Sequence, residues 1–150
     1  MDLILWRHAD ALDGEPDMAR ALTAKGRKQA EKMAAWLRQR LPANTLVLVS
    51  PAVRARQTAD ALGQDYQVLA ELAPGADGVH VLGAAGWPDA ATAVLVVGHQ
   101  PTLGEAARIL LCGEGGELSI KKGGVLWLSN RVRGGASRTF IRAAMTAELV

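Results

Sequence analysis

Arginine and histidine residues follow three short apolar runs of the sequence, at residues 3–6, 46–49 and 93–97. They are Arg7 and His8 after the first run, Arg54 with Ser50 after the second, and His99 after the third. Arginine forks match the oxygens of a phosphoryl group, and a neutral imidazole can attack phosphorus without help from a metal. These residue types therefore favour a site that binds a dianion such as a phosphoryl group, with a histidine as the candidate nucleophile.

The surrounding sequence predicts the elements that would position these side chains. Short apolar runs are typical of buried strands, and apolar residues at helical spacing predict helices. We expect strands at 3–6, 46–49, 66–69, 93–97, 125–128 and 138–142, and helices at 23–41, 51–62, 79–85 and 102–112. A turn at 133–135 would join the last two strands into an antiparallel hairpin. Strands that alternate with helices predict an α/β fold, a three-layer α/β/α sandwich with a mostly parallel central sheet.

The three polar stretches should meet, because the carboxyl ends of parallel strands share one edge of the sheet and ligands bind there. Arg54 stands about one turn into its helix, and helical side chains lean toward the N-terminus, so it can point back over the strand end. Ser50 followed by Pro51 predicts a helix N-cap and a first helical residue. This helix start and the one near Pro101 would both favour an anion at the same place.

Four segments, in this order, carry a resemblance to a known family. They are Leu5–Ala9 (LWRHA), Ala21–Gly26 (ALTAKG), Ser50–Ala59 (SPAVRARQTA) and Val97–Pro101 (VGHQP). With them the sequence resembles the histidine phosphatase superfamily, which is also called the phosphoglycerate mutase-like superfamily. The short length, the segment Glu71–Gly75 and the lack of a large inserted lid are most similar to the SixA-type phosphohistidine phosphatases.

The resemblance implies a phosphoglycerate mutase-like fold and a role for each matching residue. His8 is expected to be the nucleophile that becomes phosphorylated, and His99 to donate to the phosphoryl group in the transition state. Arg7 and Arg54 are expected to hold its oxygens, and Arg20 matches a further arginine that contacts phosphate. Catalysis would consist of two in-line displacements, would depend mainly on positioning and charge, and would need no cofactor and no metal.

Two points of the family pattern are open in this sequence. The usual Arg-His-Gly is Arg-His-Ala here, so the backbone of Ala9 must have a negative φ. The proton donor for the leaving group is either Glu71 or Asp10, or no acid is needed, because a protonated phosphohistidine is a comparatively good leaving group.

Phosphohistidine on a partner protein, such as a histidine-phosphotransfer domain, is the expected substrate. A chain of 150 residues has little room for a long lid, and a shallow site admits a side chain presented by another protein. A small phosphate ester is the alternative, which would make the protein a small-molecule phosphomonoesterase. A further alternative is that the protein is not an enzyme but a non-catalytic phosphate-binding module.

The length and composition restrict the number of domains and the kinds of partner. A length of 150 residues with 49% hydrophobic residues fits one domain over residues 1–150 with a substantial core. The net charge of +2 argues against a nucleic-acid partner, and no apolar run approaches a membrane span. We expect a cytoplasmic monomer, with the single cysteine, Cys112, as a small core residue at a helix end.

The helix expected at 23–41 is rich in basic residues, which form either a solvated face or a docking surface for an acidic partner protein. These residues are Lys25, Arg27, Lys28, Lys32, Arg38 and Arg40.

Overall fold

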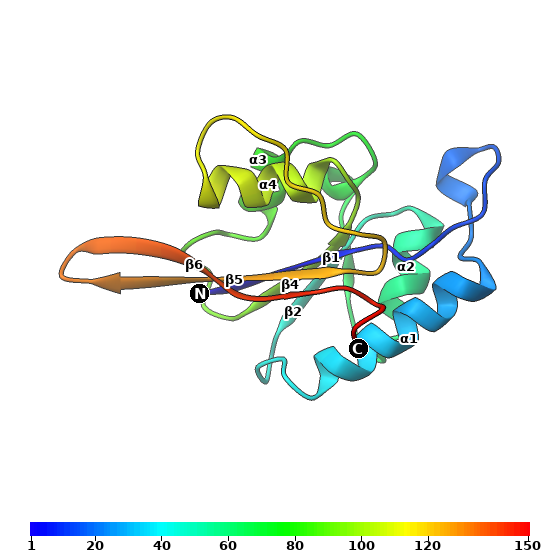
Figure 1. Cartoon of the computed structure of the whole chain (residues 1–150), viewed down its shortest axis with the longest axis horizontal. Coiled ribbons are helices and arrows are strands. Elements are labelled where there is room, and N and C mark those ends of the chain that lie inside the picture. The colour runs from blue at the N-terminus through cyan, green and yellow to red at the C-terminus, as the bar shows by residue number, and fades with distance from the viewer.

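Strands and helices alternate over most of the chain (Figure 1). The computed structural model describes residues 1–150, with strands β1 (Asp2–Arg7), β2 (Leu46–Val49), β3 (Gln67–Val68), β4 (Val94–Gly98), β5 (Val125–Arg133) and β6 (Ala136–Met145). The helices are α1 (Ala24–Arg38), α2 (Val53–Asp60), α3 (Gly78–Ala84) and α4 (Thr102–Leu111), with 3₁₀ turns η1 (Asp17–Ala19) and η2 (Ala70–Leu72). None of the helices is both long and apolar enough to cross a membrane.

All six strands belong to one sheet, in the order β3-β2-β4-β1-β5-β6. Strands β3, β2, β4 and β1 run parallel, and β5 and β6 are added antiparallel beside β1. The predicted sandwich with a mostly parallel central sheet is therefore confirmed. In the centre of the sheet, Arg7 of β1 is paired with Gly98 of β4. The residues that follow these two strands, His8 and His99, consequently emerge side by side at the same edge.

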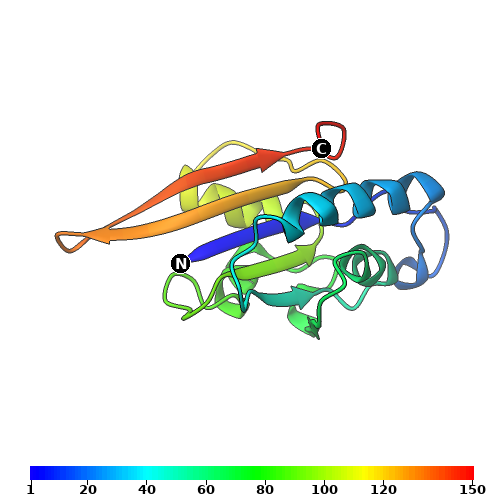
Figure 2. The same cartoon turned by 90° about the horizontal axis from the view of Figure 1, so that it is seen from below.

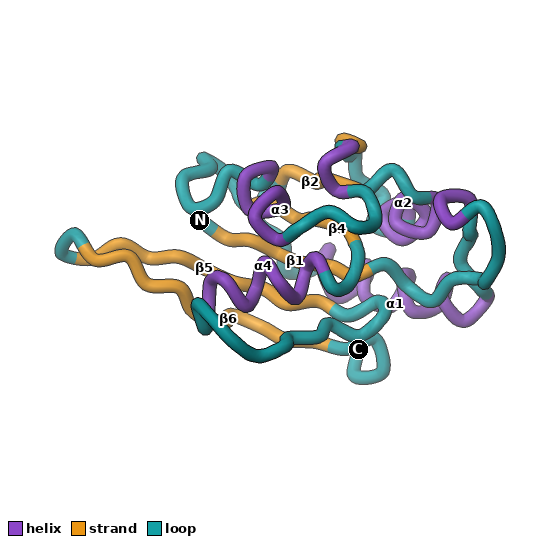
Figure 3. The backbone as a smooth tube through the Cα atoms, turned by 90° about the horizontal axis from the view of Figure 1, so that it is seen from above, coloured by secondary structure: helices purple, strands orange, loops and turns teal.

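Helices cover both faces of the sheet, which explains why the central strands are apolar without interruption. Figure 2 looks onto the face that carries α1, and Figure 3 looks onto the face that carries α3 and α4. Strand β1 alternates between the two cores: Leu3 and Leu5 pack on the α3–α4 side, whereas Ile4 and Trp6 pack on the α1–α2 side. All four side chains are completely buried. The strand that leads to His8 is thus fixed from both sides.

Two local expectations are wrong. Helix α2 has Ala52 rather than Ser50 as its N-cap residue, and no side chain caps it. The Ser50 hydroxyl instead accepts a hydrogen bond from the Ala52 N–H and lies against His99. Cys112 is exposed rather than part of the core, because the fully buried residues of α4 lie in its first half, at 102–107, and Cys112 follows its last turn.

The hairpin of β5 and β6 projects beyond the rest of the sheet (Figures 1 and 2). The N–H of Asn130 donates to the carbonyl of Met1 at the end of the paired region, and residues 131–138 are all exposed. The sequence predicts strands only at 125–128 and 138–142. The predicted strands are too short because the projecting residues have no buried face. Without one, the sequence shows no alternation of apolar and polar residues from which a strand could be recognised.

Gly26 allows helix α1 to approach the segment that follows β1. A Cβ atom at this position would lie 1.9 Å from the carbonyl oxygen of Asp10. We expect Gly26→Ala to lower the free energy of unfolding by about 1–3 kcal/mol, although alanine normally favours a helix by about 1 kcal/mol. Gly83→Ala is the control, because Gly83 also lies in a helix and a Cβ there meets nothing within 4 Å. Urea unfolding of both variants measures the difference, and equal stabilities would refute the close approach.

Candidate active site

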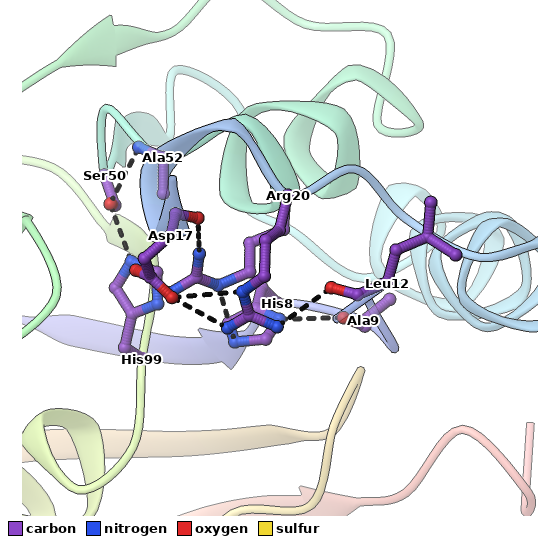
Figure 4. A network of polar contacts seen from close by, with 9 residues as sticks. His8, Ala9, Leu12, Asp17, Arg20, Ser50, Ala52 and His99 are labelled. Atoms are coloured by element: carbon purple, nitrogen blue, oxygen red, sulfur yellow. Dashed lines mark hydrogen bonds and ion pairs between the residues drawn. The ribbon is translucent and has the colours of Figure 1, made fainter. Parts of the chain in front are cut away.

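A hollow of about 280 Å³ lies at the carboxyl-terminal edge of the sheet, where β1 and β4 end. Its lining residues are Arg7, His8, Ala11, Asp13, Arg20, Arg54, Pro74, His99, Gln100 and Lys122. The structure thus brings together all five side chains that the sequence analysis assigned to a phosphoryl site. Most of them appear in Figure 4. The two histidines follow β1 and β4, Arg54 lies in the first turn of α2, and Arg20 follows η1.

His8 has one nitrogen free of a proton. Its Nδ1 lies 2.7 Å from the carbonyl oxygen of Ala9, and its Nε2 lies 3.3 Å from Nε of Arg54. A carbonyl only accepts and an arginine only donates, so Nδ1 carries the proton and Nε2 is an acceptor with a lone pair. Nε2 therefore has the electronic form of a nucleophile.

The environment of His8 keeps its imidazole neutral. The side chain is 7% exposed, and burial lowers its pKa to about 4. The hydrogen bond to Ala9 opposes this shift, whereas the positive charges of Arg54 and Arg7 add to it. At neutral pH Nε2 consequently carries a lone pair rather than a proton, as nucleophilic attack requires, and this lone pair accepts the hydrogen bond from Arg54.

His99 faces His8 across the hollow, with the two ring centres 5.1 Å apart. Its Nε2 lies 2.7 Å from the Ser50 hydroxyl, while its Nδ1 is buried without a partner. Burial lowers the pKa of His99 to about 3, and the neighbouring His8 and Arg54 act in the same direction. When the Ser50 hydroxyl donates to Nε2, the proton of the neutral ring resides on Nδ1. His99 then presents an unpaired donor.

A second unpaired donor belongs to Arg7. Its Nη1 donates to the carbonyl of Ile120 at 2.9 Å, whereas its Nε is buried without a partner. Only three buried side-chain nitrogen or oxygen atoms of the chain lack a hydrogen-bond partner, and two of them, on Arg7 and His99, belong to residues that line this hollow. Because an unsatisfied buried donor costs about 1–3 kcal/mol, a ligand oxygen that paired with either would bind favourably.

Arg54 and Arg20 converge on one acidic residue, Asp17. Figure 4 labels Asp17 and Arg20 beside His8. Nη2 of Arg54 lies 3.2 Å from Oδ2 of Asp17, and Nη1 donates to the main-chain oxygen of Asp17 at 2.9 Å. Nε and Nη2 of Arg20 both lie 3.0 Å from Oδ1 of Asp17. The carboxylate of Asp17 thus lies between the guanidinium groups of Arg54 and Arg20.

Ala9 fits the position where the family pattern has glycine. Asn44 is the only residue other than glycine with a positive φ, so the backbone at Ala9 is one that alanine adopts without strain. The N–H of Ala9 donates to the Thr58 hydroxyl at 3.0 Å, and that hydroxyl donates to the carbonyl of Arg54 at 2.7 Å. This chain of hydrogen bonds links the segment of His8 to helix α2 and so fixes the distance between His8 and Arg54.

The two acids considered from the sequence do not line the hollow. Glu71 is exposed on η2. Asp10 accepts from the Thr23 hydroxyl and from Lys122, and these two hydrogen bonds hold the pKa of Asp10 below its usual value. Asp10 is therefore an ionised residue beside the start of α1. Two other acids, which the sequence analysis missed, stand at the site: Asp13 lines the hollow, and Asp17 contacts Arg20 and Arg54. The only feature of the sequence that could have indicated Asp17 is its position three residues before Arg20.

The two buried histidines should make the protein less stable in mild acid. A histidine in an unfolded chain has a pKa near 6.5, whereas burial lowers the pKa to about 4 for His8 and about 3 for His99. Between these values the unfolded chain binds protons that the folded protein does not, so the free energy of unfolding falls as the pH drops from about 7 toward 4.

We expect the melting temperature to fall over this range in a buffer without phosphate. The fall should be shallower for His99→Gln than for His80→Gln, because His80 is an exposed histidine. Equal slopes in the two variants would contradict the lowered pKa of His99.

The arrangement is suited to hold a phosphoryl group against Nε2 of His8. The guanidinium groups of the lining arginines can bind its oxygens, and the neutral imidazole can attack its phosphorus. No three His, Cys, Asp or Glu side chains lie together in an arrangement that could hold a metal ion.

Comparison with known proteins agrees with this geometry. Residues 3–81 match the sequence model of the histidine phosphatase superfamily (branch 1). The chain is 36% identical over 124 residues to the phosphohistidine phosphatase SixA of Escherichia coli, covering 76% of each protein, and 40% identical over 149 residues to an uncharacterised protein of Picosynechococcus, covering 92% of this chain and 88% of that protein.

A solved structure is also similar, that of the protein histidine phosphatase SixA complexed with tungstate. The TM-score is 0.78 at 28% identity, with 98% of this chain and 97% of that chain covered. The matched segment 3–81 contains Arg7, His8, Arg20 and Arg54. On the match to the sequence model and on these relatives, the chain belongs to the histidine phosphatase superfamily and is similar to its SixA members.

Proposed function

We propose that this protein removes the phosphoryl group from phosphohistidine on a partner protein, through a phosphorylated form of His8. One observation carries the proposal. Nε2 of His8 is an unprotonated nitrogen in a hollow that three arginines, Arg7, Arg20 and Arg54, also line. A phosphoryl group placed there would meet a nucleophile and the donors that stabilise its charge.

In the first step, the lone pair of His8 Nε2 forms a bond to phosphorus. The bond from phosphorus to the substrate nitrogen breaks, and its electron pair stays with the departing imidazole. A substrate phosphohistidine that is protonated on its other ring nitrogen leaves as a neutral imidazole, so no further acid is required. The positive charge of that ring passes to the ring of His8, whose Nδ1 keeps its proton. Arg54 and His99 stabilise the charge on the phosphoryl oxygens while the phosphoryl group passes from the substrate nitrogen to Nε2 of His8.

In the second step, water attacks phosphorus from the side that the leaving group has vacated. The bond from phosphorus to Nε2 breaks, its electron pair returns to His8, and both protons of the water remain with the phosphate product. The hydrogen bond from Nδ1 to Ala9 keeps the imidazole in one tautomer and one orientation through both steps.

The site is better suited to the leaving group of phosphohistidine than to that of an alkyl phosphate ester. An alkoxide needs a proton in order to leave, and the carboxylate nearest to the arginines, Asp17, is held ionised by Arg20 and Arg54. Two similar proteins, both SixA, are a phosphohistidine phosphatase and a protein histidine phosphatase. The second of these is a structure with bound tungstate, which is a tetrahedral oxyanion like phosphate.

The rim of the hollow favours a substrate presented by another protein. Asp13 and Lys122, which line it, and Asp17, which stands beside it, are all exposed. Because these rim residues face solvent, a histidine on the surface of a partner can reach His8. The same openness offers few buried groups with which to select a small metabolite.

The test is to present the purified protein with a phosphohistidine-bearing domain and to measure phosphate release without added metal. We expect release, together with a transient acid-labile phosphoryl group on His8 in a rapid quench. Hydrolysis of a simple aryl phosphate but not of phosphohistidine would replace the proposal with a small-molecule phosphomonoesterase. Binding of phosphate without any turnover would replace it with a phosphate-binding module.

A further inference from the structure

Asp17 is the acidic residue that contacts two arginines of the hollow, and its carboxylate occupies hydrogen-bond donors of Arg54 and Arg20 that a phosphoryl group in the hollow could also use. Oδ2 faces Nη2 of Arg54 at 3.2 Å, and Oδ1 faces Nε and Nη2 of Arg20 at 3.0 Å (Figure 4). Arg54 is the arginine that the proposed function assigns to the phosphoryl oxygens, and the family resemblance implies a phosphate contact for Arg20. The carboxylate and an incoming phosphoryl group therefore compete for the same donors.

Hydrogen bonds from two arginines keep the carboxyl group of Asp17 ionised. Burial of the carboxyl opposes ionisation, but hydrogen bonds from Arg20 and Arg54 hold the pKa of Asp17 below its usual value. The Arg54 side chain is only 4% exposed and has no other anionic partner in the chain. The ion pair therefore neutralises a buried guanidinium that would otherwise stand unpaired next to two neutral histidines.

The two members of this ion pair differ in their freedom to move. The side chain of Asp17 is 50% exposed, and η1, on which it stands, contains no buried residue. Arg54 is buried in the first turn of α2, and its Nε is engaged with His8. An anion that entered the hollow would thus displace the aspartate toward solvent at little loss of packing, while the arginine would stay in place.

On the basis of the proposed function, we propose that Asp17 is a specificity-determining residue that acts as an internal competitor for Arg54 and Arg20. A phosphoryl dianion gives these forks more charge and more acceptors than the carboxylate does, so it displaces Asp17. A monoanion such as a phosphodiester offers less and leaves the ion pair closed. Asp17 thereby selects terminal phosphoryl groups by their charge.

The alternative role for Asp17 is to position Arg54. The two roles predict opposite changes in the affinity for inorganic phosphate when the charge of Asp17 is removed. Asp17→Asn keeps the size of the side chain and removes the charge. If Asp17 competes, Asp17→Asn should bind inorganic phosphate about tenfold more tightly than the wild type, and dimethyl phosphate should become a detectable ligand. If Asp17 positions Arg54, phosphate binding should weaken.

Isothermal titration at pH 8 with inorganic phosphate and with dimethyl phosphate makes the comparison, since phosphate is mainly a dianion there. Glu15→Gln is the matched control, because it removes the same charge from an exposed residue of the same loop that lies outside the hollow. It should change the dissociation constant less than twofold, and Asp17→Glu should restore a value near that of the wild type.

Unchanged or weaker phosphate binding by Asp17→Asn overturns the inference and leaves the proposed function standing. If phosphate binds neither to the wild type nor to any variant, the proposed function fails and the inference fails with it. Melting temperatures of all four proteins show that each is folded. Because η1 buries none of its residues, they should differ little.

Discussion

His8→Ala should lose phosphatase activity by about 10⁴-fold or more while remaining folded. Removal of the nucleophile from a covalent catalyst leaves only the rate that positioning and charge provide. The His8 side chain contacts its surroundings through two hydrogen bonds, to the adjacent Ala9 carbonyl and from Arg54, so its loss leaves the central strands intact. Phosphate release from a phosphohistidine-bearing domain, followed with excess enzyme, measures the effect.

The matched control is His80→Ala. His80 is an exposed histidine whose ring pairs with Asp77 at the start of α3. This variant should retain the activity of the wild type and the phosphoryl label on His8. Activity that survived in His8→Ala, or a label that moved to His80, would remove His8 as the nucleophile.

Arg54→Ala should weaken the binding of phosphate or vanadate by about 2–5 kcal/mol, which is the usual loss when a buried charge loses its partner. Three groups of Arg54 contribute to this expectation. Nε donates to Nε2 of His8, and the two terminal nitrogens reach Asp17. The substitution removes the donors and leaves the carboxylate of Asp17 facing the incoming anion, so both changes act in the same direction.

Arg56→Ala is the control for Arg54→Ala, because Arg56 lies two residues further along α2 and is exposed. It should leave the dissociation constant of vanadate unchanged. Arg54→Lys should bind with intermediate affinity, since it keeps the charge but not the planar fork. An affinity in Arg54→Ala equal to that of the wild type would remove Arg54 from the site.

The position of these residues follows from the sequence because strand ends are easy to recognise. The runs at 3–6, 46–49 and 93–97 are uninterrupted apolar segments, and each ends abruptly in polar residues. Once the strands are parallel neighbours, the ends must meet, and His8, Arg54 and His99 must meet with them. This part of the site could be predicted because it depends only on where the buried parallel strands end.

The remainder of the site depends on a loop, and loops give no such pattern. Asp17 lies in an exposed segment of irregular backbone between β1 and α1, where no apolar period fixes the direction of a side chain. Ser50 appears in the sequence as a helix cap, because a serine followed by a proline is typical of one. Its hydroxyl lies instead against His99, since α2 begins two residues later than expected.

The sheet ends differently at its two edges, and each ending discourages a further strand. At one edge β3 has only two residues, Gln67 and Val68, too few to template a partner. At the other edge β6 is ten residues long, but its register is interrupted so that Arg142 has no opposite residue, and Arg138 stands directly across from Arg131. A second copy that approached this edge would meet its own positive charges. We therefore expect electrostatic repulsion to oppose edge-to-edge aggregation of the projecting hairpin, and added salt to weaken this repulsion.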